Sequence, residues 1–261
     1  MDNQSQHNIL ITKDEGRISP RFIIISFLAF LISVTAIIYF YFSMCCDMEM
    51  PGGWTMSMMW MRMPGETWLA SFLSFILMWV TMMVAMMIPS ALPMFLKTKQ
   101  QWNFLCYTAL GYFSVWLLAG VGVYVMTMQI AKITMQSGAL SHAVPLLSGT
   151  ILIFAGTYQF TRLKITNLLH CRSQFGCAIS TINRETSFQL GCKQGIVCCI
   201  CCSGLMIVEL ILGIMNPIVM AAVAIAITAE KLLPKPEIIV RFVGVVAIIA
   251  GIVIIINWLI N

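Results

Sequence analysis

The most prominent pattern along the chain is a series of long apolar stretches separated by short polar segments. A helix needs about 20 apolar residues to cross the roughly 30 Å of bilayer hydrocarbon. Seven stretches reach or approach this length: residues 22–43, 67–90, 104–128, 143–161, 193–214, 217–233 and 237–259. The pattern therefore predicts an all-α protein, a polytopic transmembrane helix bundle of about seven spans.

The boundaries of two stretches carry additional signals. Asn216 and Pro217 separate the fifth stretch from the sixth, and proline suits the first turn of a helix because its missing N–H would be unpaired there. The sixth stretch is short and ends in Glu230 and Lys231, which we expect to form an ion pair at the inner membrane interface. In the second stretch, Pro89 predicts a break near the inner end of the helix.

The basic residues predict the direction in which the chain crosses the membrane. Lys and Arg gather in short cytoplasmic loops. With the N-terminus inside and the loops alternating, thirteen of the fifteen basic residues fall on the inner side, and only Arg62 and Lys132 fall outside. We therefore expect a cytoplasmic N-terminal segment at residues 1–21 and an external C-terminus. The remaining chain, residues 22–261, is expected to be one domain with a methionine-rich outer loop at 44–66 and a cytoplasmic loop at 162–192.

Composition supports this reading and excludes others. The chain is 60% hydrophobic and only 10% charged, whereas a soluble domain carries roughly 25% charged residues. We expect the lipid bilayer as a partner and the cell inner (plasma) membrane as the location, with several passes. No basic stripe with interleaved aromatic residues indicates a nucleic-acid partner. No Ser/His/Asp set, phosphate loop or pair of acids in a polar pocket indicates an enzyme.

The outer loop between the first two stretches is unusually rich in methionine. Eight methionines fall within residues 44–63. Thioethers bind Cu(I) and similar soft ions but hold Zn²⁺ or Mg²⁺ poorly, so this composition favours capture of a soft metal. The candidate ligands are Cys45, Cys46, Met56, Met58 and Met59. The alternative is a flexible apolar filler that lies on the bilayer surface.

Methionine also dominates one side of the second stretch. Met78, Met82 and Met86 repeat every four residues and so share a helical face, and Met83 and Met87 form an adjacent row. A methionine stripe at this spacing is often simple packing. The density favours a ligand role, because leucine packs more specifically.

The fifth stretch carries a comparable cysteine face. Cys198, Cys201 and Cys202 are spaced three and four residues apart, and Met206 extends their face by one turn. The predicted orientation puts them in the inner half of the membrane, where the reducing cytosol disfavours disulfides. They could be small buried hydrophobes in a close helix contact. Three sulfurs on one face favour metal ligation.

Three further residues are candidates for function. Glu209 lies near the middle of the fifth stretch, where an acid is costly and is functional by default. His170 and Cys171, in the expected inner loop, are possible cytoplasmic ligands.

These motifs together resemble a family of bacterial and archaeal proteins described as predicted metal-binding integral membrane proteins (domain of unknown function 2182). The resemblance covers roughly residues 50–240. It rests on Met78-Trp79, Met82-Met83-Val84-Ala85-Met86-Met87-Ile88-Pro89-Ser90, Gly111-Tyr112 with Trp116, Ala155-Gly156-Thr157-Tyr158-Gln159 with Lys164, His170-Cys171-Arg172-Ser173, Gly195 with Cys198, Cys201-Cys202, Leu205-Met206, Met215-Asn216 and Glu230-Lys231-Leu232-Leu233-Pro234. The resemblance implies a metal-binding membrane protein.

Three functions follow from these observations. The leading hypothesis is an integral membrane protein that binds and transfers a soft metal ion, most readily Cu(I), through methionine and cysteine side chains. The second is a membrane metallochaperone or assembly factor that loads a copper enzyme, with a copper protein or chaperone as its partner. The third is a structural membrane protein with no metal role.

Overall fold

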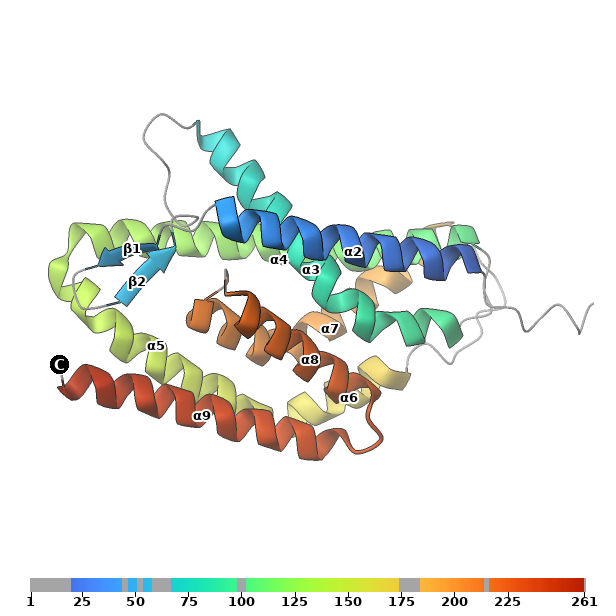
Figure 1. Ribbon diagram of the computed structural model, residues 1–261. Coiled ribbons are helices and arrows are strands. Elements are labelled where there is room, and N and C mark those ends of the chain that lie inside the picture. Colours follow the sequence, from blue (N-terminus) through green and yellow to red (C-terminus); the bar gives the residue numbers. More distant parts are fainter. Residues whose placement is uncertain are drawn as a thin grey trace, which may run out of the picture.

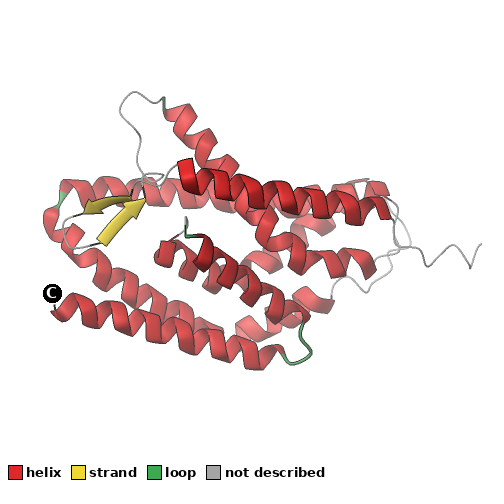
Figure 2. Ribbon diagram, viewed as in Figure 1, coloured by secondary structure: helices red, strands yellow, loops and turns green. Residues whose placement is uncertain are grey.

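The computed structural model describes residues 20–43, 47–50, 54–57, 67–97, 102–173, 184–213 and 216–260. The helices in these ranges are α2 (Pro20–Ser43), α3 (Trp68–Lys97), α4 (Trp102–Gln136), α5 (Gly138–Gln159), α6 (Arg162–Ser173), α7 (Arg184–Gly213), α8 (Pro217–Leu232) and α9 (Pro236–Ile260). Between α2 and α3, strand β1 (Asp47–Met50) pairs antiparallel with strand β2 (Trp54–Ser57). The long helices form one bundle (Figure 1), and the described residues form no strands other than those of this small hairpin (Figure 2). The predicted helical fold class is confirmed.

Length and composition support five or six membrane spans. The helices α2, α3, α4, α7 and α9 each contain a segment long and apolar enough to cross a bilayer. The helices α5 and α6 meet at an angle of 62° and make a sixth candidate if the bent pair crosses as one span. The helix α8 has 16 residues, fewer than the about 20 that a straight span needs. The seventh span and the orientation of the termini therefore remain predictions.

Two helix boundaries differ from the sequence-based expectations. The helix α3 continues through Pro89 to Lys97, so the expected break at its inner end is wrong. Proline removes one hydrogen bond of the helix, and neighbouring helices can compensate for that loss in a packed bundle. The segment 162–192, expected as a loop, is helical over α6 and again from Arg184 onward.

The start of α8 follows the sequence signal. The side-chain oxygen of Asn216 accepts hydrogen bonds from the backbone N–H groups of Ile218, at 3.0 Å, and Val219, at 3.4 Å. These bonds satisfy two of the donors that a helix leaves unpaired at its N-terminus. Pro217 then occupies the first turn, as expected.

Glycines allow two helix pairs to pack backbone against backbone. A Cβ atom added to Gly156 of α5 would lie 2.8 Å from the carbonyl oxygen of Gly244 in α9, so only glycine permits this approach. The two helices lie side by side in Figure 1. In the same way, a Cβ atom on Gly191 of α7 would collide with the carbonyl oxygen of Thr108 in α4. Small residues at such contacts are typical of membrane helix pairs.

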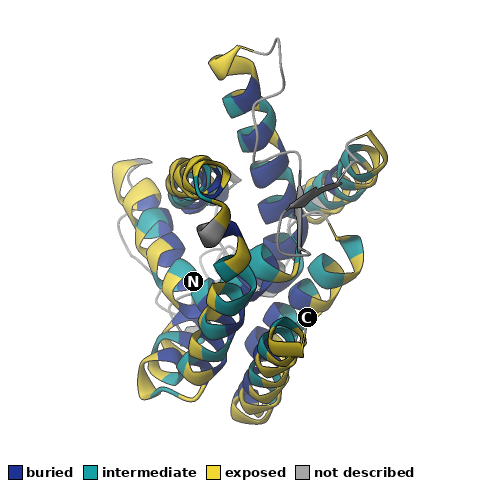
Figure 3. Ribbon diagram, turned by 90° about the vertical axis from the view of Figure 1, so that its left-hand side faces the viewer, coloured by how far each residue is buried: buried dark blue, intermediate teal, exposed yellow. Residues whose placement is uncertain are grey.

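Burial divides the bundle into an inner and an outer surface. Buried residues face the middle of the bundle, and exposed residues face outward (Figure 3). The outward residues include large apolar side chains such as Phe42, Phe154 and Ile218, each about three-quarters exposed. An outer surface of this kind suits lipid rather than water.

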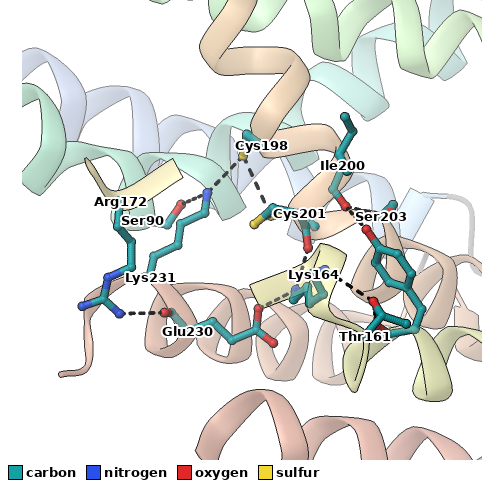
Figure 4. Close-up of polar contacts among 12 residues, drawn as sticks. Ser90, Thr161, Lys164, Arg172, Cys198, Ile200, Cys201, Ser203, Glu230 and Lys231 are labelled. Carbon is teal, nitrogen blue, oxygen red and sulfur yellow. Dashed lines mark hydrogen bonds and ion pairs between the residues drawn. The ribbon is translucent and has the colours of Figure 1, made fainter. Parts of the chain in front are cut away.

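A buried ion pair connects α6 to α8. The Lys164 ammonium donates to Glu230 Oε2 at 2.8 Å and also to the backbone carbonyl of Cys201 in α7 (Figure 4). The Arg172 guanidinium of α6 donates to the carbonyl oxygens of Glu230, at 3.2 Å, and Leu233, at 2.7 Å. A cation at this place satisfies carbonyls that the end of α8 leaves unpaired. These contacts hold α6, α7 and α8 in a fixed arrangement.

Removing one partner of this ion pair is expected to destabilise the bundle more than removing both. Lys164→Met leaves the Glu230 carboxylate buried without its cation, and the expected cost is about 3–5 kcal/mol in the free energy of unfolding. The double variant Lys164→Met/Glu230→Leu removes both charges and should recover more than half of that loss. Thermal unfolding of the detergent-purified proteins measures this, with Lys193→Met, at an exposed lysine, as the control. Equal unfolding temperatures for the single and double variants would contradict the role of the pair.

Candidate functional site

The methionine face of α3 is buried in the middle of the bundle. Its five members are each at most 3% exposed: Met78, Met82, Met83, Met86 and Met87. The helix packs against α2, α4 and α8, and this face is the one directed inward. All five belong to a single core cluster of the protein.

The cysteine face of α7 is buried in the same cluster. Cys198, Cys201 and Cys202 are at most 1% exposed, and Met206 joins them one turn further along α7. The sulfur of Cys202 lies 3.8 Å from the sulfur of Cys198 and 3.8 Å from that of Cys201. The structure therefore places the thioethers of α3 and the thiols of α7 in one buried core cluster, and we call its sulfur side chains the sulfur cluster.

Cys171 belongs to the sulfur cluster as well. It is buried in α6 and belongs to the same core cluster as Cys198 and Cys201. Gln194 of α7 fixes it further, by donating to the Cys171 carbonyl oxygen at 3.2 Å. His170, its neighbour in sequence, lies on the exposed side of α6. The expectation that both residues belong to an inner loop hid this difference, because a loop has no regular pattern of side-chain directions, whereas adjacent side chains of a helix point about 100° apart.

Sequence reasoning missed two polar residues that contact Cys198 and a third that holds one of them in place. The hydroxyl of Tyr112, in α4, lies 2.9 Å from Cys198 Sγ. The ammonium of Lys231, in α8, donates to Cys198 Sγ at 3.1 Å and to the hydroxyl of Ser90, in α3, at 3.2 Å. Figure 4 shows Lys231 reaching across to Cys198 from the other side of the cluster. Cys198 is thus the place where side chains of α3, α4, α7 and α8 converge.

The expected ion pair between Glu230 and Lys231 is wrong. Glu230 pairs with Lys164, and Lys231 is 6% exposed and points to the sulfur cluster. Consecutive residues of a helix point about 100° apart and do not face each other. This geometry follows from the sequence alone, and it predicts that the side chains of Glu230 and Lys231 point in different directions.

Glu209 lies on α7 seven residues beyond Cys202. Its side chain is 1% exposed, and neither carboxylate oxygen has a hydrogen-bond partner among the described residues. An acid buried in this way is costly, as expected from its place in the apolar stretch.

The outer-loop candidates cannot be placed in the same way. Cys45, Cys46, Met58 and Met59 lie outside the described residues, and Met56 is described only as part of the backbone of β2. Among the described side chains, no group of three or more His, Cys, Asp and Glu residues has the arrangement of a metal site.

The donor chemistry of the sulfur cluster suits a soft metal ion. Thiolate and thioether sulfurs are the ligands that Cu(I) prefers. Two thiolates that each bind an ion at about 2.3 Å lie at most about 4.6 Å apart, and the separation of 3.8 Å between the sulfurs of Cys198 and Cys202 is within that limit. These two cysteines, with thioethers of α3 from the same core cluster, are the residues that could hold such an ion.

Comparison with known proteins identifies the family to which the chain belongs. No curated protein and no solved structure shows significant similarity to the chain. A protein-family model described as "PpoB2: Copper chaperone" matches residues 76–254, from the methionine face of α3 to the last turns of α9. Such a family indicates a copper-related, non-catalytic role. Because the match extends over well more than half of the chain and includes every described member of the sulfur cluster, the protein belongs to the PpoB2 family of copper chaperones.

Proposed function

We propose that the protein is a membrane-embedded copper chaperone that holds Cu(I) in the sulfur cluster and delivers it to an acceptor protein. One observation carries the proposal: thiols of α6 and α7 and thioethers of α3 lie in the same buried cluster. Family membership supplies the metal. In this proposal Cys198 and Cys202 supply thiolate ligands, and Met82 and Met86 supply thioether ligands.

The chemistry of the ligands favours transfer over permanent storage. Thioethers are neutral, so burying five of them in α3 carries no charge that must be balanced. They bind Cu(I) more weakly than thiolates do and can exchange it, which delivery requires. The methionine-rich outer loop, with Cys45, Cys46, Met56, Met58 and Met59, would collect the ion before it enters the bundle.

A seven-span topology accompanies this proposal, with the N-terminus in the cytoplasm and the C-terminus outside. The distribution of the basic residues supports it. So does the arrangement of the bundle, because the first residue of α2 and the last residue of α9 lie at opposite ends of it (Figure 1). In this topology α8 is the short sixth span, and its Lys231 end lies toward the cytoplasm.

A second candidate function is transport of the ion across the membrane. The buried thioethers extend from Met78 to Met87 of α3, and nine residue steps of helix correspond to about 13.5 Å at 1.5 Å per residue. A row of exchangeable ligands of that length covers a large part of the hydrocarbon thickness. Transport would move the ion to the other side of the membrane, whereas delivery would release it on the side from which it was loaded.

Loss of the thiols should abolish most copper binding. Cys198→Ser/Cys202→Ser is expected to weaken Cu(I) binding by at least about 10–100-fold, because even the loss of a group that only supports a ligand costs that much. Competition with a chromophoric Cu(I) chelator under reducing conditions measures the affinity. The matched control is Cys106→Ser/Cys192→Ser, at two cysteines that are not fully buried and lie outside the cluster.

The thioethers can be tested in the same assay. Met82→Leu/Met86→Leu preserves side-chain volume and should leave the fold intact while lowering the Cu(I) affinity. Met126→Leu/Met135→Leu, at exposed positions of α4, provides the control. Unchanged affinity in both the serine and the leucine double variants would overturn the proposed copper site.

Delivery and transport can be separated in proteoliposomes. If the protein is a chaperone, copper bound to it should pass to a chelator on the side from which it was loaded, and none should reach a chelator trapped inside the vesicles. Protein-free vesicles give the background leak. Accumulation of copper inside, dependent on Met78 through Met87, would instead support transport.

The topology can be tested with a reporter enzyme that is active only outside the cytoplasm. Fused after Asn261 it should be active, and fused between α3 and α4 it should be inactive. Inactivity at both places would mean an even number of spans and would contradict the proposed orientation.

A further inference from the structure

The side chain of Lys231 is a buried cation that forms no ion pair with a carboxylate of the described residues. Its polar contacts are Cys198 Sγ at 3.1 Å and Ser90 Oγ at 3.2 Å. The adjacent carboxylate of Glu230 turns toward Lys164, with which it forms an ion pair at 2.8 Å, and Figure 4 shows the two side chains leaving α8 in different directions. An ammonium in such a place is costly unless a nearby group balances it, and here the sulfur is in position to do so.

The contacts of Lys231 hold the ammonium against the sulfur cluster. Ser90 anchors it from α3, and its stem is buried where α8 packs against α3 and α7. An ion bound by Cys198 and Cys202 would therefore have a fixed positive charge as its neighbour. Both Lys231 and Cys198 are buried, so salt screens charges at this place only weakly.

We propose that Lys231 makes the sulfur cluster selective for monovalent over divalent soft ions. The proposal rests on the proposed function, which places the ion on Cys198 and Cys202. The energy of two charges is proportional to their product, so the ammonium repels a divalent ion twice as strongly as a monovalent ion at the same position. Thiolates alone would have the opposite effect, because they attract the ion of higher charge more strongly.

This selectivity addresses a problem that sulfur ligands do not solve. Thiolates bind Zn²⁺ as well as Cu(I), so a thiol pair by itself does not reject the divalent ion. A fixed cation rejects it by charge, and does so without changing the ligands. Lys231 is thus a specificity-determining residue rather than a ligand.

The test is the ratio of affinities for Ag(I) and Cd(II), two soft ions that differ in charge. Both are titrated into the purified full-length protein under reducing conditions, free of other metals. Lys231→Gln removes the charge, and the affinity for Cd(II) is expected to rise by at least about tenfold relative to that for Ag(I). Lys231→Arg keeps the charge and should keep the ratio of the natural protein. Lys235→Gln, at an exposed lysine between α8 and α9, is the matched control and should also leave the ratio unchanged.

A milder variant tests the same idea without changing Lys231. Ser90→Ala removes one anchor of the ammonium and should shift the ratio in the same direction by a smaller factor. An unchanged ratio in both Lys231→Gln and Ser90→Ala, with Ag(I) still bound, would overturn the selectivity role alone. Absence of Ag(I) and Cu(I) binding by the natural protein would overturn the proposed function and this inference together.

Discussion

Charges buried in an apolar bundle have to be balanced by other groups of the protein, because no water is there to solvate them. Lys164 and Glu230 balance each other and join α6 to α8. Lys231 has no such carboxylate in the described part of the chain and is placed between Ser90 and Cys198, so it joins α8 to α3 and α7. The sulfur cluster lies where these connections meet. The positions of the thiols therefore depend on the ion pair and hydrogen bonds that Lys164, Glu230 and Lys231 form.

The sequence predicts the helices well because both length and apolar composition are local properties. It also predicts which sulfur side chains share a face, since positions 198 and 202, or 82 and 86, are one helical turn apart. The helix α6 was missed, because the polar residues after Gln159 are typical of a loop as much as of a short helix. Cys171 was placed in that loop for the same reason.

The hydrophobic pattern of the sequence does not predict which helices pack against each other. Which helices pack together depends on contacts such as Gly156 of α5 with Gly244 of α9 and Gly191 of α7 with Thr108 of α4, where a single added carbon would prevent the observed approach. A glycine in an apolar stretch does not reveal its partner. Tyr112 and Lys231 were missed as neighbours of Cys198, and Ser90 as a partner of Lys231, because each comes from a different helix.

The partners of Cys198 bear on how tightly an ion could be held. Its sulfur already contacts the hydroxyl of Tyr112 and the ammonium of Lys231, and an incoming ion has to compete with both. A hydrogen bond to a charged group contributes about 1.5–3 kcal/mol. An ion that has to displace one such bond from Cys198 therefore binds about 10- to 150-fold more weakly. A structural zinc site, closed by four protein ligands, has no such competition. For a chaperone this competition is useful, because the same contacts re-form when the ion leaves and no buried charge is left without a partner.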